Sequence, residues 1–139
     1  MIAHLRPAAK KKKKTPLRFT ATCGSGLETL VEQEIAAFGG EALATQPGAV
    51  TWSGSLETGY RACLWSRFAS RILLELVRFD APTTDALYAG TGEVLWDEHL
   101  TAKTTFAVHT TLVNAAINHS QFASLRIKDA IADQFRKRF

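Results

Sequence analysis

The sequence is poor in cysteine and has no long apolar run, and each shortage excludes a class of protein. Its 139 residues include only two cysteines, Cys23 and Cys63, too few for a disulfide framework. They predict reduced thiols in a cytosolic protein. No apolar run approaches the roughly 18 residues that a membrane-spanning helix needs. The opening MIAHLRPAAKKKKK lacks the apolar segment of a secretory signal peptide. We therefore expect a cytoplasmic protein with no membrane partner.

Active-site motifs are also missing. No pair of Cys or His residues has the spacing of zinc ligands. The Gly-x-Gly sequences that start at Gly24 and Gly90 lack the third glycine of a dinucleotide-binding loop, and neither has the lysine of a P-loop. There is no Gly-x-Ser-x-Gly elbow, and no cysteine lies beside a potential base. We predict that this chain carries no catalytic residue, no metal and no cofactor site of its own.

The charged side chains, in contrast, are ordinary in number but unevenly distributed. Although the net charge is +4, residues 1–18 hold seven basic side chains and no acidic one. The last twenty residues hold five basic and two acidic side chains, while residues 19–119 carry a net charge of −6. Such a distribution indicates a polyanionic partner that is contacted at particular places. Residues 1–17 are expected to be a disordered basic tail, in which Lys10–Lys14 either contact RNA phosphates or stay solvated.

Residues 18–79 alternate between the patterns of strands and helices. Ser25 followed by Glu28 has the spacing of a capping box and predicts a helix start, and Gly39 predicts its end. Ser55 predicts the start of a second helix. Strands and helices are expected, in order, at residues 17–22, 25–38, 43–44, 49–52, 55–68 and 72–79. This β-α-β-β-α-β order is typical of a ferredoxin-like split βαβ sandwich, so we predict an α+β fold with a ferredoxin-like domain at residues 18–80.

Residues 81–139 are expected to form a second domain. A short helix to about Val94 and a strand over Thr105–Val113 precede a final helix, which Asn118 is predicted to cap with Gln121 in the capping-box position. One face of this helix is apolar, with members at Ile127, Ile131, Phe135 and Phe139. The opposite face is predicted to be polar, with Arg126, Asp129, Asp133 and Lys137. The apolar face needs a sheet to cover it, so we expect an internal helix and a domain that is incomplete at the C-terminus.

Two basic clusters each allow a functional and a structural interpretation. Arg67 and Arg71 are four residues apart and could bind phosphates, or they could stabilise a helix end or pair with Glu75. The basic residues of the final helix, including Arg138, could form an RNA-binding patch or a solvated face. The acidic character of the rest of the body favours RNA for the final helix.

Five short stretches resemble the bacterial THUMP-containing ribosomal RNA guanine methyltransferases. Phe19–Glu28 resembles their opening strand and "GLE" helix start, and Leu64–Ile72 resembles their "WSRxASRI" stretch. Three later stretches resemble the "TFAVH", "NSQ" and "VKDAI" elements, and they lie at Thr105–His109, Asn118–Gln121 and Ile127–Ile131. The stretches follow one another in the family's order, and the resemblance covers nearly all of residues 18–139. The lysine run departs from it.

The resemblance implies a division of labour within a longer chain. The ferredoxin-like unit and a THUMP domain, here residues 81–139, would bind 23S ribosomal RNA rather than DNA. A separate methyltransferase domain would bind S-adenosylmethionine and methylate the N2 of a guanine. Its Asn-Pro-Pro-aromatic motif has no counterpart in this sequence. The residues that the resemblance or the charge pattern suggests for RNA binding are Arg126, Lys128, Asn118 and Ser120, with Lys103, Arg136 and Lys137 suggested from charge alone.

Two alternative functions remain open at this point. The chain could be a stand-alone THUMP-type protein that binds RNA or serves tRNA modification without a methyltransferase domain. It could also be a structural module that docks a partner protein.

Overall fold

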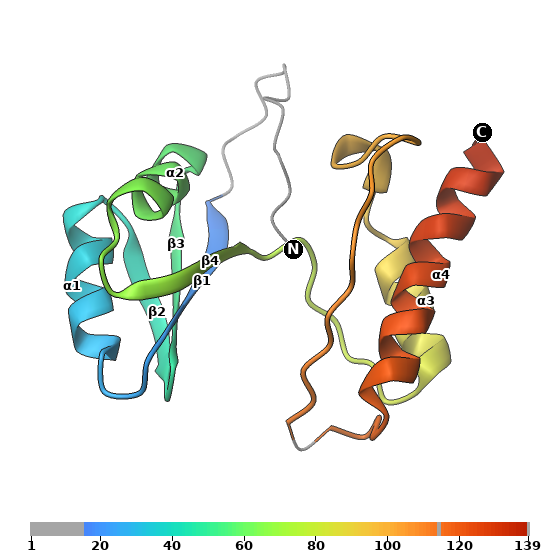
Figure 1. Ribbon diagram of the computed structural model, residues 1–139, viewed down its shortest axis with the longest axis horizontal. Coiled ribbons are helices and arrows are strands. Elements are labelled where there is room, and N and C mark those ends of the chain that lie inside the picture. Colours follow the sequence, from blue (N-terminus) through green and yellow to red (C-terminus); the bar gives the residue numbers. More distant parts are fainter. Residues whose placement is uncertain (1–15, 114, 139) are drawn as a thin grey trace. The chain divides into compact units, whose positions relative to one another are not determined.

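The computed structural model describes residues 16–113 and 115–138, and these divide between Glu75 and Leu76 into two compact units (Figure 1). The expected basic tail, Lys10–Lys14 included, lies almost entirely outside the described residues.

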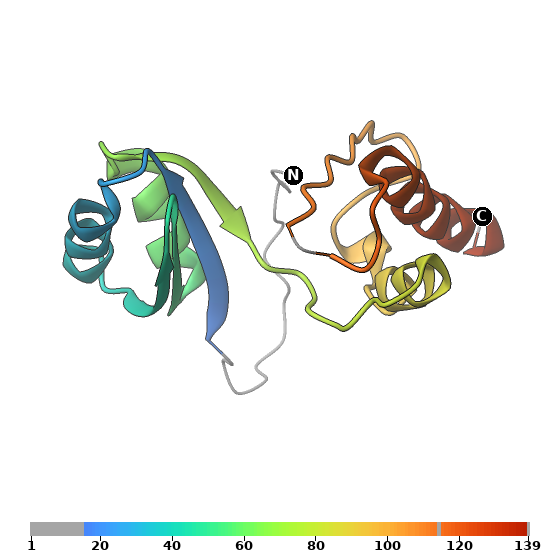
Figure 2. The same cartoon turned by 90° about the horizontal axis from the view of Figure 1, so that it is seen from below.

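The first unit contains a four-stranded sheet and two helices. The strand order is β2-β3-β1-β4, and all three pairings are antiparallel. Figure 2 shows both helices on the same face of this sheet. The elements are β1 (Leu17–Cys23), α1 (Glu28–Ala37), β2 (Glu41–Gln46), β3 (Ala49–Gly54), α2 (Leu56–Trp65) and β4 (Ala69–Leu74). The predicted β-α-β-β-α-β order and the α+β class are therefore confirmed.

The core of this unit lies between the sheet and its helices. Phe19 and Trp52 face each other on neighbouring strands, and their rings stack with centroids 4.4 Å apart. Gly59 of α2 lies against Phe19, where an added Cβ would come within 2.6 Å of the ring, so glycine permits the close approach of the helix. The buried apolar residues are Phe19, Ala21, Val31, Ile35, Val50, Trp52 and Ala62.

The predicted capping box at Ser25 is wrong. Leu27 occupies the N-cap position of α1 without a side-chain hydrogen bond. Gly26 takes a positive φ of 95° before the helix, which starts two residues later than the pattern suggested. Glu28 instead joins two turns, because its carboxylate accepts hydrogen bonds from the N–H groups of Gly26 and Gly48, each at 2.8 Å. Glu28 thus connects the start of α1 to the β2–β3 turn.

Replacing Glu28 by glutamine should lower the melting temperature at neutral pH and change how stability depends on acid. The hydrogen bond from the Gly48 N–H, followed by those from its own N–H and that of Gly26, lowers the pKa of Glu28 below 4.5. The ionised carboxylate therefore stabilises the fold above its ordinary pKa, and this stabilisation is lost as the pH falls through the lowered value. Thermal melts followed by circular dichroism should show the wild type and Glu28→Gln converging in acid. A difference that stays constant with pH would contradict this role.

The boundaries of α2 and β4 differ from those predicted. Ser55 caps α2 as predicted, since its hydroxyl accepts from the Thr58 N–H at 3.2 Å. The helix ends at Trp65, however, because Glu34 accepts hydrogen bonds from the Ser66 hydroxyl at 2.6 Å and the Arg67 N–H at 2.8 Å and turns the chain. The strand consequently starts three residues early, and Arg71 lies on β4 rather than on a helix with Arg67. The shared helical face considered for the two arginines does not form.

The second unit is built from helices and irregular chain in its described part. Helix α3 (Thr84–Gly92) is capped by Thr83 and followed by a short 3₁₀ turn, η1 (Trp96–Glu98). Helix α4 (Ser120–Arg138) packs beside α3 in both views (Figures 1 and 2). Between η1 and α4 the chain is irregular. The buried core is Val94, Trp96, Leu100 and Ile131, with Leu76, Phe106, Val108, Ile127 and Phe135 packed against it.

The predicted strand over Thr105–Val113 does not form. A strand requires a hydrogen-bonded neighbour, and the described part of the second unit offers this segment none. The alternation nevertheless has a physical basis, since Phe106 and Val108 both turn toward the core. The segment therefore has no strand partner in the described part, and the side chains of alternate residues hold it against the core.

The predicted start of the last helix is also wrong. The Nδ1 of His119, not the side chain of Asn118, accepts the hydrogen bond from the Phe122 N–H at 3.1 Å. The apolar stripe is confirmed for Ile127, Ile131 and Phe135, while Phe139 lies outside the described residues. The polar face is only partly as predicted, because two of its members, Arg126 and Asp133, turn toward α3.

Candidate RNA interface

The seven residues suggested for RNA binding all lie in the second unit, but they do not form one cluster. Lys103 lies in the loop after η1, and Asn118 and Ser120 lie at the start of α4. The other four follow along that helix. Because an α-helix rises about 1.5 Å per residue, Ser120 and Lys137 are about 26 Å apart along its axis. The arrangement suits contacts along an extended RNA strand better than it suits a single phosphate-binding pocket.

The predicted residues also face different neighbours around α4. Lys128 lines a groove of about 390 Å³ between the irregular segment 104–108 and the helix, where it is the one charged side chain of the lining. Arg136 lines a second hollow of about 370 Å³ that shares Thr104 and Phe106 with the first. Arg126, in contrast, faces α3. The structure therefore separates Arg126 from Lys128, although the two are only two residues apart.

The cations divide into paired arginines and unpaired lysines. Arg126 pairs with Asp85 at 3.3 Å, Arg136 pairs with Asp133 at 3.4 Å, and Arg138 pairs with Asp97. Within residues 16–113 and 115–138, the side chains of Lys103, Lys128 and Lys137 have no ion-pair partner, and all three are exposed. The partners of these three lysines must therefore come from outside the described chain or be solvent.

The start of α4 adds a favourable site for negative charge. Asn118 and Ser120 are exposed there, and the first turn contains no acidic residue. The free N–H groups and partial positive charge of a helix N-terminus favour phosphate oxygens. The exposed hydroxyl and amide add further hydrogen-bonding groups. This end of the helix is therefore chemically compatible with the role that the resemblance implies.

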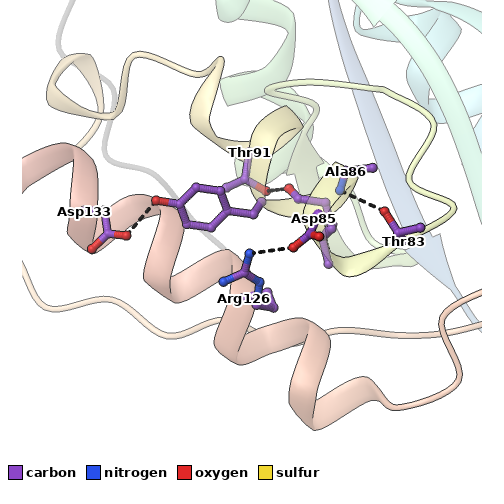
Figure 3. A network of polar contacts seen from close by, with 8 residues as sticks. Thr83, Asp85, Ala86, Thr91, Arg126 and Asp133 are labelled. Atoms are coloured by element: carbon purple, nitrogen blue, oxygen red, sulfur yellow. Dashed lines mark hydrogen bonds and ion pairs between the residues drawn. The ribbon is translucent and has the colours of Figure 1, made fainter.

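A polar network fixes α4 against the rest of the unit. The Tyr88 hydroxyl donates to Asp133 at 2.6 Å, and the Arg126 guanidinium lies 4.5 Å from the centre of the Tyr88 ring. Figure 3 shows Arg126 and Asp133 reaching from α4 toward α3. Gln134 accepts from the Trp96 N–H at 2.8 Å and donates to the carbonyls of Val94 and Gly92. These contacts hold the basic helix in one orientation.

Sequence reasoning missed several members of this network. Asp85, Tyr88 and Gln134 belong to no motif, and each contacts a partner about forty residues away in the chain. No local spacing could have shown these contacts. The hydrogen bond to Asp133, then burial, raises the pKa of Tyr88 above 10.0, so its hydroxyl keeps its proton at neutral pH.

The described residues contain neither a cluster of metal ligands nor the parallel sheet of a doubly wound cofactor fold. No group of His, Cys, Asp and Glu side chains in them could hold a metal. The sheet of the first unit has only antiparallel pairings, whereas cofactor crevices of the doubly wound type lie at the carboxyl ends of parallel strands. No helix of the described ranges is long and apolar enough to cross a membrane.

Comparison with known proteins also finds two domains in the chain. Residues 18–73 match the family described as the RlmL ferredoxin-like domain, and residues 81–139 match the THUMP domain. The chain is 52% identical over 120 residues to the ribosomal RNA large subunit methyltransferase K/L of Desulfotalea psychrophila. That match covers 86% of this chain and 17% of the relative.

Solved structures share the fold. One, described as a predicted N6-adenine-specific DNA methylase from Listeria monocytogenes, is 28% identical with a TM-score of 0.80, covering 89% of this chain and 32% of that one. Another, a putative methyltransferase complexed with SAH, is 25% identical with a TM-score of 0.79, covering 91% of this chain and 33% of that one.

The chain thus spans about one sixth of the length of the K/L methyltransferases that it matches. Both of its units have counterparts in these relatives and in the solved structures. The chain therefore contains an RlmL ferredoxin-like domain followed by a THUMP domain, and over these domains it is similar to ribosomal RNA large subunit methyltransferases K/L.

Proposed function

We propose that this chain is the RNA-binding N-terminal portion of an S-adenosylmethionine-dependent methyltransferase that acts on the N2 of a guanine in 23S ribosomal RNA. The observation that carries the proposal is the 52% identity to a large-subunit ribosomal RNA methyltransferase across both units. The three unpaired lysines of the THUMP unit agree with it, because they are available for phosphate contacts. The chain is proposed to act in the cytoplasm.

The RNA-facing residues are proposed to follow α4 from end to end. Asn118 and Ser120 would contact a phosphate at the helix N-terminus. Lys128 would neutralise a phosphate at the groove beside residues 104–108, and Lys103 and Lys137 would extend this contact toward the far end. Arg126 and Arg136 already have carboxylate partners, so RNA would have to compete for them.

The methyl transfer itself is proposed to take place in another domain of the same full-length protein. No step of the reaction is assigned to the residues described here. The proposed domain boundaries are residues 18–80 for the ferredoxin-like domain and 81–139 for the THUMP domain. Their role is to bind and position the ribosomal RNA for the catalytic domain.

A second candidate, a stand-alone THUMP protein that serves tRNA modification, has less support. Its expected substrate is tRNA, whereas the relatives with the higher identity carry names that specify ribosomal RNA. The name of one structural neighbour specifies DNA adenine, but that neighbour is only 28% identical. Binding to ribosomal RNA in preference to tRNA and DNA separates the three possibilities.

Lys128→Glu should weaken RNA binding and flatten its salt dependence. The substitution removes one phosphate contact and places a negative charge on the same surface, so the magnitude of the log–log salt slope should fall by about 0.7 or more for single-stranded RNA. Titration of labelled ribosomal RNA at several salt concentrations measures both quantities. Glu93→Gln, on the exposed end of α3, serves as a control for an unrelated change of charge. Unchanged affinity across the salt range would remove Lys128 from the interface.

A further inference from the structure

The two side chains of the ion pair between Arg126 and Asp85 differ greatly in their exposure to solvent. The side chain of Arg126 is 27% exposed, whereas that of Asp85 is 93% exposed, and the closest atoms are 3.3 Å apart. An ion pair with so solvated a carboxylate contributes little to stability, because water competes for the carboxylate. Asp85 can therefore leave Arg126 at little cost.

Asp85 is not the only contact that holds Arg126 among the described residues. Its guanidinium lies over the Tyr88 ring at 4.5 Å, and the Tyr88 hydroxyl is fixed by the hydrogen bond to Asp133 at 2.6 Å. Stacking on an aromatic ring orients a guanidinium and leaves its N–H edge free to bind an anion. The nearby charge of Asp133 is offset by its ion pair with Arg136. The arginine is thus already held in place for a ligand.

We propose that Arg126, stacked on Tyr88, is a binding site for an RNA phosphate, and that Asp85 occupies this site until the phosphate displaces it. A guanidinium binds carboxylate and phosphate oxygens with the same planar geometry, so one anion can replace the other. RNA brings many phosphates and releases counterions when it binds, whereas Asp85 is a single solvated carboxylate. The inference rests on the proposed RNA-binding function and adds Tyr88 to it as a positioning residue and Asp85 as a competing carboxylate.

Removal of the competing carboxylate should strengthen RNA binding. Asp85→Asn should raise the affinity of the 139-residue chain for a labelled single-stranded RNA oligonucleotide by about 1.4-fold to fivefold, the value of a surface ion pair. Arg126→Ala should lower the affinity and reduce the salt slope by about 0.7. In the double variant, most of the gain from Asp85→Asn should disappear, because the site it frees is gone. Fluorescence anisotropy over a salt series measures all four proteins.

Two controls separate displacement from a general change of charge or packing. Asp129→Asn removes a carboxylate from the same neighbourhood without a hydrogen bond to Arg126, so it should raise the affinity less than Asp85→Asn. Tyr88→Phe keeps the ring and should retain most RNA binding, whereas Tyr88→Leu loses the ring and should behave like Arg126→Ala. Thermal melts identify any variant that fails to fold.

The outcomes distinguish this inference from the function on which it rests. Equal gains from Asp85→Asn and Asp129→Asn, or a gain that persists in the Arg126→Ala background, would overturn the displacement while leaving RNA binding intact. A wild-type chain that does not bind RNA would overturn the proposed function and this inference together.

Discussion

Trp52→Ala is expected to unfold the first unit or bring it close to unfolding. The side chain is fully buried, stacks on Phe19, and lies among residues of both helices and the sheet. Removal of a buried tryptophan typically costs about 3–5 kcal/mol, which is a large part of the roughly 5–15 kcal/mol that stabilises a domain. Urea denaturation followed by far-ultraviolet circular dichroism should show that the unfolding transition of the first unit is lost or moves to a much lower urea concentration.

Two matched variants test whether burial is the cause. Trp65→Ala removes the same indole from a position that is 64% exposed, and it should change stability by about 0.5 kcal/mol or less. Trp52→Phe keeps the stacked ring and removes an indole N–H that has no hydrogen-bond partner, so it should cost much less than alanine. Equal effects of Trp52→Ala and Trp65→Ala would contradict the described core.

The double charge reversal Lys128→Glu/Lys137→Glu is expected to weaken RNA binding by roughly thirtyfold. A phosphate contact on a single strand adds about 0.7 to the salt slope, which corresponds to roughly fourfold in affinity at physiological salt relative to 1 M. Loss of two contacts therefore gives about fifteenfold, and the two added negative charges repel RNA further. Both lysines are exposed, so the fold should be unaffected. Affinity and salt slope should fall together.

The matched control reverses two cations of the first unit. Arg67→Glu/Arg71→Glu changes the net charge by the same amount, and both side chains are exposed. If RNA binds along α4, this control should reduce affinity far less than the reversal of the two lysines. A loss of the same size in both variants would mean that RNA responds to overall charge and not to the THUMP surface. It would also restore a phosphate-binding role for the two arginines.

Local sequence patterns predicted the parts of the fold that depend on neighbouring residues. The Ser55 cap and the apolar stripe of Ile127, Ile131 and Phe135 were predicted because capping and helical periodicity act over three or four residues. The strand over Thr105–Val113 was not predicted correctly, because a strand depends on a partner that its own residues do not specify. The capping box at Ser25 failed for a similar reason, since Glu28 binds the distant turn at Gly48.

Local sequence patterns were also insufficient to predict the contacts of the candidate site. The resemblance suggested Lys128 and charge alone suggested Lys137, and neither has an ion-pair partner among the described residues. The sequence could not show that Arg126 faces α3 while Lys128 faces the groove beside residues 104–108, because this depends on how two helices pack. Nor could composition separate the buried Trp52 from the exposed Trp65. Tertiary packing, not local pattern, decides which cations are available to a ligand.

The most direct test of the proposed function is filter binding of the chain to 23S ribosomal RNA, with tRNA and duplex DNA as competitors over a salt series. The chain should be compared with a variant in which Lys10–Lys14 are glutamine, because this run could bind any polyanion. Both proteins should prefer 23S ribosomal RNA, and Lys128→Glu should weaken this binding in either background. Equal affinity for the competitors, or binding that disappears with the lysine run, would contradict it.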